Sequence, residues 1–365
     1  MKKEIVRFNN SNNVEFIKAL RLNVNSYFKE KRISKYGNMN MYLKTAFMVL
    51  MYFIPLILML AGQITTTPIM YLMWFIMSLG MAGIGLSVMH DANHGAYSQN
   101  KHINSFFGWI VNFLGAYHIN WKVQHNVLHH SFTNIEGHDE DITKPVMRFS
   151  PEQPYKKSFR FQAYYAPLFY GLLTIYWLIA KDIDQVLRYG KRNLLKGQNR
   201  STTSAMIEIV TYKVLYVILT IVLPILILDI HWGHVLAGFF MMQFISGLIL
   251  ALIFQAAHVL EETHFYVPGE NGSIENNWAI HQLKTTSNFS TNNSLFTWLV
   301  GGLNHQVEHH LFPHVCHVHY PKISKIIEKT AADFDIPYLQ HETFFGALSS
   351  HFTLLNKLGK EEVVT

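Results

Sequence analysis

Residues 45–89 read TAFMVLMYFIPLILMLAGQITTTPIMYLMWFIMSLGMAGIGLSVM, an apolar block with one polar interruption, QITTTP, at 63–68. Each half has about 20 residues, the length of helix that crosses the hydrocarbon core of a bilayer. A second apolar block, at about 214–257, is interrupted in the same way by DIHWGH at 229–234. The two blocks predict an all-α integral membrane protein with four transmembrane helices, arranged as two hairpins.

Basic side chains lie around these blocks and not within them. The sequence has neither lysine nor arginine between Lys44 and Lys101, or between Lys213 and Lys284. Short loops without basic residues tend to face away from the cytoplasm. We therefore expect both termini and the segment 90–208 on the cytoplasmic side of a membrane, in a bacterium the inner membrane.

Two shorter apolar stretches lie within the cytoplasmic middle segment. The stretch 106–117 is too short to span a bilayer. The stretch 163–180 is long enough to span, but it contains Pro167 and several aromatic residues, which favours a helix lying in the membrane interface. The polar first forty residues predict no cleavable signal peptide.

Composition supports a membrane protein and limits the chemistry of any metal site. Half of the 365 residues are hydrophobic and only 15% are charged, against about 25% in soluble domains. The net charge of +6 suits a surface on anionic lipid, and the apolar blocks disfavour a nucleic-acid partner. The single cysteine, Cys316, excludes an intramolecular disulfide or an all-cysteine metal site within this sequence.

The 21 histidines are not scattered evenly. Three groups stand out: HDANH at 90–94, HNVLHH at 125–130 and HQVEHH at 305–310. Residues four apart share one face of a helix, so His90 with His94, and His125 with His129, are predicted to pair. The same spacing joins His305 to His309 and Gln306 to His310. All three groups fall outside the apolar spans and on one predicted side of the membrane.

Clustered imidazoles without thiolates suit zinc, copper, iron or nickel. A structural zinc needs four ligands, whereas at least seven clustered histidines are present, enough for two metal ions with open positions. Two irons would indicate oxygen chemistry and two zincs hydrolysis. Residue types alone leave that choice open.

At these residues the sequence resembles the membrane fatty acid desaturase family. The resemblance rests on HDANHG at 90–95, HNVLHHSFTN at 125–134, WAIHQLKTTSNF at 278–289 and GGLNHQVEHHLFPHV at 301–315. These motifs are similar to the bacterial and front-end branches, the Δ5/Δ6 and linoleoyl-CoA desaturases. The resemblance implies a cytoplasmic helical cap that holds two iron ions, with ligands His90, His94, His125, His129, His130, His309 and His310, and with His258 as an additional ligand.

The third motif departs from the simplest family pattern. Gln306 stands three residues before the His309–His310 pair, as in front-end desaturases, but His305 lies directly beside it. Either residue could complete the metal shell. Residues that could orient the ligand imidazoles, because metal-bound histidines need an acceptor for their second N–H, are Asp91, Asn93, Asp139, Asp141, Gln306 and Glu308.

The family resemblance implies an O2-dependent fatty-acyl desaturase that introduces a double bond into a long-chain acyl group. The same site could support an acyl hydroxylase, epoxygenase or ketolase. A metal transporter would need ionisable residues within the spans, which are nearly free of them. The acyl group could be carried by CoA, a carrier protein or a glycerolipid.

Electrons are expected from a separate ferredoxin or cytochrome b5-like protein, because the first forty residues lack a His-Pro-Gly-Gly haem motif. The domain prediction is a cytoplasmic N-terminal segment at 1–41, a desaturase domain at 42–340 and a C-terminal tail at 341–365.

Overall fold

The computed structural model describes residues 6–360, which are predominantly helical. The chain divides into two compact units. Among the described residues, the first unit comprises 6–37, 124–166 and 252–360, and the second comprises 38–123 and 167–251. Each unit is built from separate stretches of sequence, so residues far apart along the chain meet within it.

The second unit contains most of the apolar helices. Its elements are α2 (Met39–Leu60), α3 (Thr67–Gly83), η1 (Ile84–Val88), α4 (Met89–Asn93), α5 (Lys101–Trp109), η2 (Ile110–Leu114), α6 (His118–Lys122), α9 (Leu173–Tyr176), η5 (Trp177–Lys181), α10 (Asp182–Lys191), η6 (Lys196–Gln198), α11 (Thr202–Val217), η7 (Ile218–Val222), α12 (Leu223–Ile227) and most of α13 (Trp232–His258).

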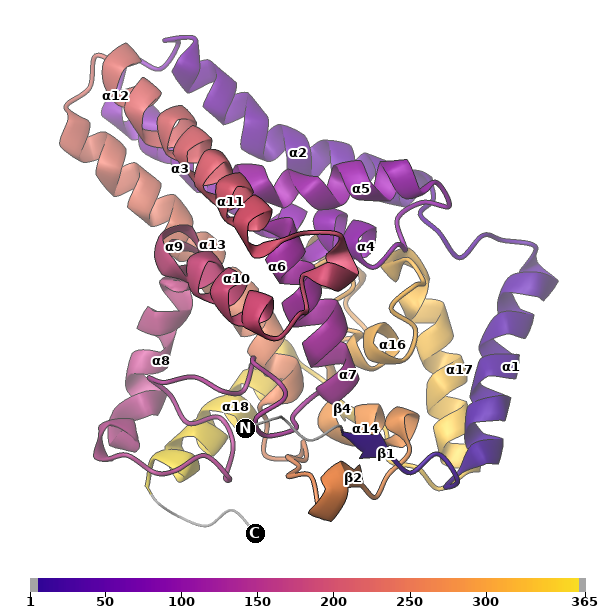
Figure 1. Cartoon of the computed structure of the whole chain (residues 1–365). Helices are drawn as coiled ribbons and strands as arrows, with labels where there is room; N and C mark the ends of the chain where they lie inside the picture. Colours follow the sequence, from indigo (N-terminus) through magenta and orange to yellow (C-terminus); the bar gives the residue numbers. More distant parts are fainter. Residues whose placement is uncertain (1–5, 361–365) are drawn as a thin grey trace. The chain divides into compact units, whose positions relative to one another are not determined.

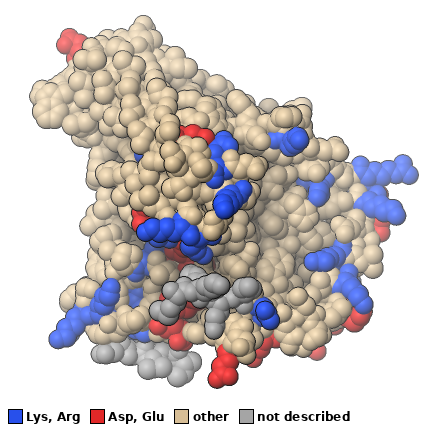
Figure 2. Space-filling view, in the orientation of Figure 1, with Lys and Arg blue, Asp and Glu red and all other residues tan. Residues whose placement is uncertain are grey.

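Among residues 6–360, four continuous helices are long and apolar enough to cross a membrane, as predicted. They are Met39–Leu60, Thr67–Asn93, Thr202–Ile227 and Trp232–His258, with mean hydropathies of 2.1, 1.8, 2.2 and 2.2. In the space-filling view, the surface over α2 and α12 carries few charged side chains (Figure 2). An uncharged surface over long apolar helices is what a hydrocarbon environment requires.

Small residues let these helices approach closely. A Cβ at Gly80 of α3 would lie 2.6 Å from the backbone nitrogen of Tyr52 in α2, and the two helices pack together in Figure 1. A Cβ at Gly247 of α13 would lie 2.6 Å from the carbonyl oxygen of Gly171. Close backbone contact through small residues is typical of helices that pack within a bilayer.

The two shorter apolar stretches do not form straight spans. Residues 106–117 include the end of α5 and the 3-10 helix η2. The stretch 163–180 lies in helices that bend by 60° between Gly171 and Leu173. Its first helix, α8 (Gln162–Gly171), contains Pro167. The interfacial position of the stretch 163–180 remains a prediction.

The first unit has a core in which α1 (Val14–Lys31) and α17 (Tyr320–Asp333) lie side by side (Figure 1). Phe16 and Leu20 of α1 share this core with Ile327 of α17 and with residues of α14 (Trp278–Thr285) and α16 (Gln306–Leu311). The core therefore fixes α14 and α16, which carry residues of the candidate site. The remaining helices of the unit are η3 (Val123–His129, from Gln124 on), α7 (His130–Phe132), η4 (Lys157–Phe161), η8 (Glu270–Gly272), α15 (Ser294–Leu299), η9 (His317–His319) and α18 (Phe344–Gly359).

Two features of the first unit differ from a purely helical fold with a loose tail. Four short strands form two parallel pairs, β1 (Arg7–Phe8) with β2 (Ser273–Ile274) and β3 (Ser287–Phe289) with β4 (Leu339–His341). Strands of two or three residues are too short to show an alternating pattern. The segment predicted as a C-terminal tail contains α18, which has seven buried residues between Ala347 and Gly359.

Candidate metal centre

The second histidine group lies on a π-helix, η3, followed directly by α7. Hydrogen bonds in a π-helix join residues five apart, and such segments are frequent at functional sites. Accordingly, the Nε2 atoms of His125 and His130 lie 3.2 Å apart. The rings of His125 and His129 do stack, at 5.4 Å, as the spacing of four predicted. Their nitrogens nevertheless fall into different groups.

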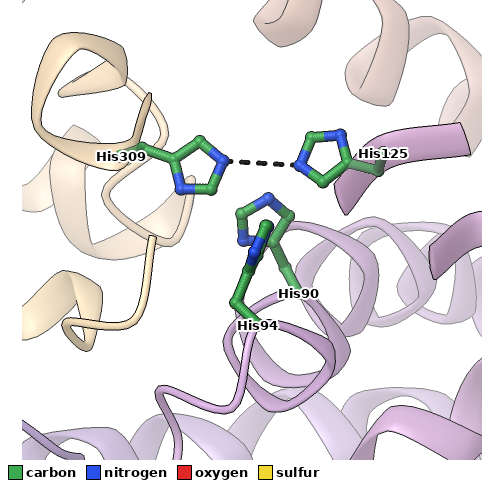
Figure 3. Close-up of side chains that lie close together, drawn as sticks. All are labelled: His90, His94, His125 and His309. Atoms are coloured by element: carbon green, nitrogen blue, oxygen red, sulfur yellow. Dashed lines mark hydrogen bonds between the residues drawn. The ribbon is translucent and has the colours of Figure 1, made fainter. Parts of the chain in front are cut away.

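Within the first unit, His309 from α16 lies close to both His125 and His130. The Nε2 of His309 lies 2.9 Å from that of His130 and 3.4 Å from that of His125 (Figure 3). With metal–nitrogen bonds of about 2.0–2.1 Å, neighbouring ligands lie about 3.0 Å apart in an octahedral site and about 3.4 Å in a tetrahedral one. The three nitrogens are therefore spaced like ligands of one metal ion.

The second group consists of His129, His258 and His310, whose ligand nitrogens all lie within 4.8 Å of one another. His129 ends η3, His258 ends α13 and His310 lies on α16. At most 1% of each residue is exposed. Phe254, one turn before His258, places its ring 5.0 Å from the rings of both His129 and His258. This apolar cover helps to keep water from the group.

Each imidazole of this second group has its Nδ1 next to an acceptor. The Nδ1 atoms lie 3.0 Å from Asp139 Oδ2 for His129, 3.3 Å from the Thr285 carbonyl for His258 and 2.8 Å from Gln282 Oε1 for His310. An acceptor at Nδ1 holds the proton there and leaves the lone pair on Nε2. All three rings are thus in the tautomer that presents Nε2 to a metal.

Asp139 also sets the charge at His129. It is 1% exposed, and its Oδ2 accepts a second hydrogen bond from the backbone N–H of Asn134, at 3.0 Å. Burial alone would lower the pKa of His129, but the charge of Asp139 and its hydrogen bond raise that pKa overall. A carboxylate behind a histidine makes the imidazole a stronger metal ligand.

The buried nitrogens fit a metal ion. Among the described residues, Nε2 of His129 makes no hydrogen bond, and burying an unpaired polar atom is costly. A metal bond at Nε2 removes that cost. Imidazole-only donor sets suit iron, zinc or copper, so the residues present fit the irons that the family resemblance implies.

The first histidine group belongs to the second unit and follows the π-helix η1. The rings of His90 and His94 lie 4.8 Å apart, as the spacing of four predicted (Figure 3). The Trp121 ring lies 5.5 Å from His90. Of the predicted orienting residues, Asp91 lies 3.8 Å from His90 Nδ1, and Asn93 donates to the Gly108 carbonyl on α5. Asn93 therefore holds α5 against α4.

Gln306 and His305 of the third motif have different surroundings. Gln306 interacts with the His258 side chain. His305 precedes α16 and belongs to none of the nitrogen groups found among residues 6–360. Its Nδ1 lies 3.6 Å from Glu308, whose carboxylate accepts hydrogen bonds from Asn288 and Tyr338.

Asp141, the remaining predicted orienting residue, lies 3.7 Å from His129 Nδ1. Its other oxygen accepts a hydrogen bond from Gln124. Asp141 therefore faces the same imidazole nitrogen as Asp139, but from a longer distance.

Sequence reasoning did not single out several residues that contact the histidines. The hydroxyl of Tyr320 lies 3.3 Å from His309 Nδ1. The Thr133 hydroxyl lies 2.9 Å from Gln282 Oε1, and this oxygen lies 2.8 Å from His310 Nδ1. Gln282 falls in the WAIHQLKTTSNF stretch, so the motif was visible, but its contact with His310 depends on the fold.

The fold and the site together define a class, a helical protein with four membrane-capable helices and buried histidine groups that could hold metal ions. Comparison with known proteins narrows this class. The fatty acid desaturase family model matches residues 66–342. The chain therefore belongs to the fatty acid desaturase family and is a fatty-acyl desaturase, an oxidoreductase.

Relatives match nearly the whole chain. It is 38% identical to the sn-1 linoleoyl-lipid 6-desaturase of Synechocystis sp., over 94% of this chain and 96% of that protein. The sn-1 linoleoyl-lipid 6-desaturase of Arthrospira platensis is 35% identical, over 94% of this chain and 93% of that protein. The acyl-lipid (8-3)-desaturase of Physcomitrium patens is 34% identical, over 99% of this chain and 75% of that protein.

Proposed function

We propose that this desaturase uses O2 and two histidine-bound iron ions to introduce a double bond into a long-chain acyl group of a membrane glycerolipid. The observation that carries the proposal is the group of His129, His258 and His310, in which every Nδ1 faces an acceptor. Three buried imidazoles prepared in this way support the assignment of a metal site.

In this proposal His129, His258 and His310 bind one iron, and His125, His130 and His309 bind the other. His90 and His94 complete the set, as their family motif implies. Gln306, through its contact with His258, is favoured over His305 as the additional group of the third motif. Asp139 and Asp141 orient His129, and Asp91 lies beside His90 at 3.8 Å. Asn93 holds α5 against α4, and Glu308 joins Asn288 and Tyr338 through hydrogen bonds.

The bound irons would supply the activation of O2 that carbon–hydrogen cleavage requires. Overall, –CH2–CH2– with O2, two electrons and two protons gives –CH=CH– and two water molecules. The residues of this chain position the metal ligands and exclude water through Phe254. The acceptors at Nδ1 hold the proton there and leave each Nε2 free to bind metal. Positioning of the acyl chain then selects the carbons that react.

An apolar groove in the second unit supports a glycerolipid substrate. Its volume is about 620 Å³, within the range of about 300–1,000 Å³ that small-molecule sites occupy. On α2 it runs from Tyr42 to Phe53, about 16 Å at 1.5 Å per residue, or half of the ~30 Å hydrocarbon core. Lys101 begins α5 between the lining residues Ser98 and Ile103, where it can meet a lipid phosphate. We assign the groove to the second acyl chain of the lipid.

The proposed topology is two membrane hairpins, with the histidines and both termini on the cytoplasmic side of a bacterial inner membrane. The absence of basic residues from both hairpin sequences supports it. The domain boundaries at 41 and 340 are proposed on the same basis. Electrons are proposed to come from a ferredoxin or a cytochrome b5-like protein.

Expression in an aerobic bacterial host with a ferredoxin system tests the function, with a His309→Ala variant as control. Mass spectrometry of derivatised lipids would locate a new double bond that is absent from the control. An added hydroxyl, epoxide or keto oxygen would instead identify one of the alternative oxygenases. No product together with no bound iron in the wild-type protein would refute the di-iron proposal.

A further inference from the structure

Helix α14 lies in the first unit and presents one face to the second histidine motif. Trp278, His281 and Gln282 are spaced by three and four residues, so they share a helix face. The Trp278 indole donates to the His130 carbonyl at 3.2 Å, and the Gln282 amide donates to the same oxygen at 3.3 Å. His281 Nε2 lies 2.7 Å from the Thr133 carbonyl. All three side chains therefore bind carbonyls between 130 and 133.

These carbonyls need partners because of the local structure. Helix α7 has only three residues, and the last carbonyls of a helix lack intrahelical donors. A buried carbonyl without a donor is costly. The face of α14 supplies the donors, and in doing so fixes the backbone that carries His129 and His130.

Gln282 has a second contact, with the third histidine motif. Its Oε1 lies 2.8 Å from His310 Nδ1 and 2.9 Å from the Thr133 hydroxyl. The opposite orientation of the amide would bring its oxygen against the His130 carbonyl oxygen at 3.3 Å, which is repulsive. The amide must therefore direct its oxygen to His310, and the proton of His310 must lie on Nδ1.

Gln282 thus joins two ligand-bearing segments with one fully buried side chain. His130 and His310 are about 180 positions apart along the chain. The geometry points to Gln282 as a positioning residue that fixes the tautomer of His310 and its place relative to the second motif. This inference rests on the proposed metal function and adds a residue that sets the affinity of the centre.

Metal binding separates this role from a general effect on folding. Gln282→Leu removes both the acceptor and the donor, whereas Gln282→Glu keeps an acceptor for His310. Gln162→Leu is the matched control, because Gln162 is equally buried in the first unit but bonds to backbone atoms of Arg148 and Leu355. Each purified protein would be titrated with Fe2+ and with Co2+, whose absorption bands report the ligand set.

Gln282→Leu is expected to weaken binding of one metal ion by about 10–100-fold, the usual effect of losing a partner behind a ligand. Gln282→Glu should keep the metal stoichiometry and shift the Co2+ bands, and Gln162→Leu should change neither. Wild-type affinity and bands in Gln282→Leu, or equal losses in Gln282→Leu and Gln282→Glu, would overturn the positioning role. A wild-type protein that binds no metal would instead refute the proposed function.

Discussion

The two units carry their histidines in different surroundings. In the first unit, His129 has the buried carboxylate of Asp139 at 3.0 Å from its Nδ1. In the second unit, the carboxylate of Asp91 lies 3.8 Å from the Nδ1 of His90, beyond hydrogen-bonding distance. The first unit thus builds a buried, hydrogen-bonded polar centre, while the second presents a histidine pair beside long apolar helices. The difference teaches that one motif, two histidines four apart, can be supported to very different degrees.

The largest effect is expected from removing a proposed ligand of the first unit, from the group of His129, His258 and His310. His129→Ala should abolish desaturation and reduce bound metal by one ion per chain, because its Nε2 is one of the three buried nitrogens proposed to hold that ion. Product analysis by mass spectrometry and metal analysis of the purified protein provide the two measurements. Full metal content in this variant would contradict the assignment of His129 as a ligand.

The carboxylates test the comparison directly. Asp139→Asn should weaken metal binding by about 10–100-fold, because the hydrogen bond behind His129 and the raised pKa of that imidazole both depend on the negative charge. Asp91→Asn should weaken metal binding much less, because the Asp91 carboxylate lies 3.8 Å from His90 Nδ1. Metal titration of both variants decides the matter, and equal losses would remove the distinction between the units.

The third motif provides a contrast between neighbours. Gln306→Ala should lower metal affinity about tenfold because Gln306 interacts with His258. His305→Ala should leave metal affinity near that of the wild type, since His305 lies against Glu308. The reverse result would transfer the additional role in the metal shell from Gln306 to His305.

A substitution in the groove of the second unit should lower activity on the lipid and leave metal binding unchanged. Ala46→Trp fills the apolar groove, so activity on a diacyl glycerolipid should fall several-fold while activity on the corresponding lysolipid, with one chain, persists. Leu50→Trp is the control, because Leu50 is exposed on α2 outside the groove. Equal loss on both lipids would refute the assignment of the groove to the second chain.

The last prediction concerns the acid stability of the first unit, away from the histidine groups. Burial lowers the pKa of His351 to about 4, and its Nδ1 lies 2.7 Å from the Val259 carbonyl. The unfolded chain takes up a proton near pH 6.5 and the folded one does not, so stability is complete above pH 6.5 and falls towards pH 4.

Between pH 7 and pH 5, protonation of His351 in the unfolded chain should lower the free energy of unfolding by about 2 kcal/mol. His351→Gln should reduce the fall in Tm over that range, measured in detergent, while His102→Gln at an exposed position should not. An unchanged fall in Tm would show that His351 does not contribute to acid sensitivity.

Sequence patterns predicted the helices well because length and hydropathy are local properties. The four apolar helices match the predicted blocks, and α4, η3 and α16 carry the three histidine motifs. The π-helix at 123–129 was not predicted, since the spacing HNVLHH is compatible with either helix type. It gives the short contact between His125 and His130 that helical spacing of four does not.

The sequence by itself determined the membrane-capable helices, the imidazole-rich chemistry and the membership of the desaturase family. Only the tertiary structure decided which nitrogens face one another, that His258 joins His129 and His310, and that Gln282 holds His310. The physical reason is that these contacts join segments up to about 180 residues apart. Spacing along the chain fixes the face of a helix, but packing fixes what that face meets.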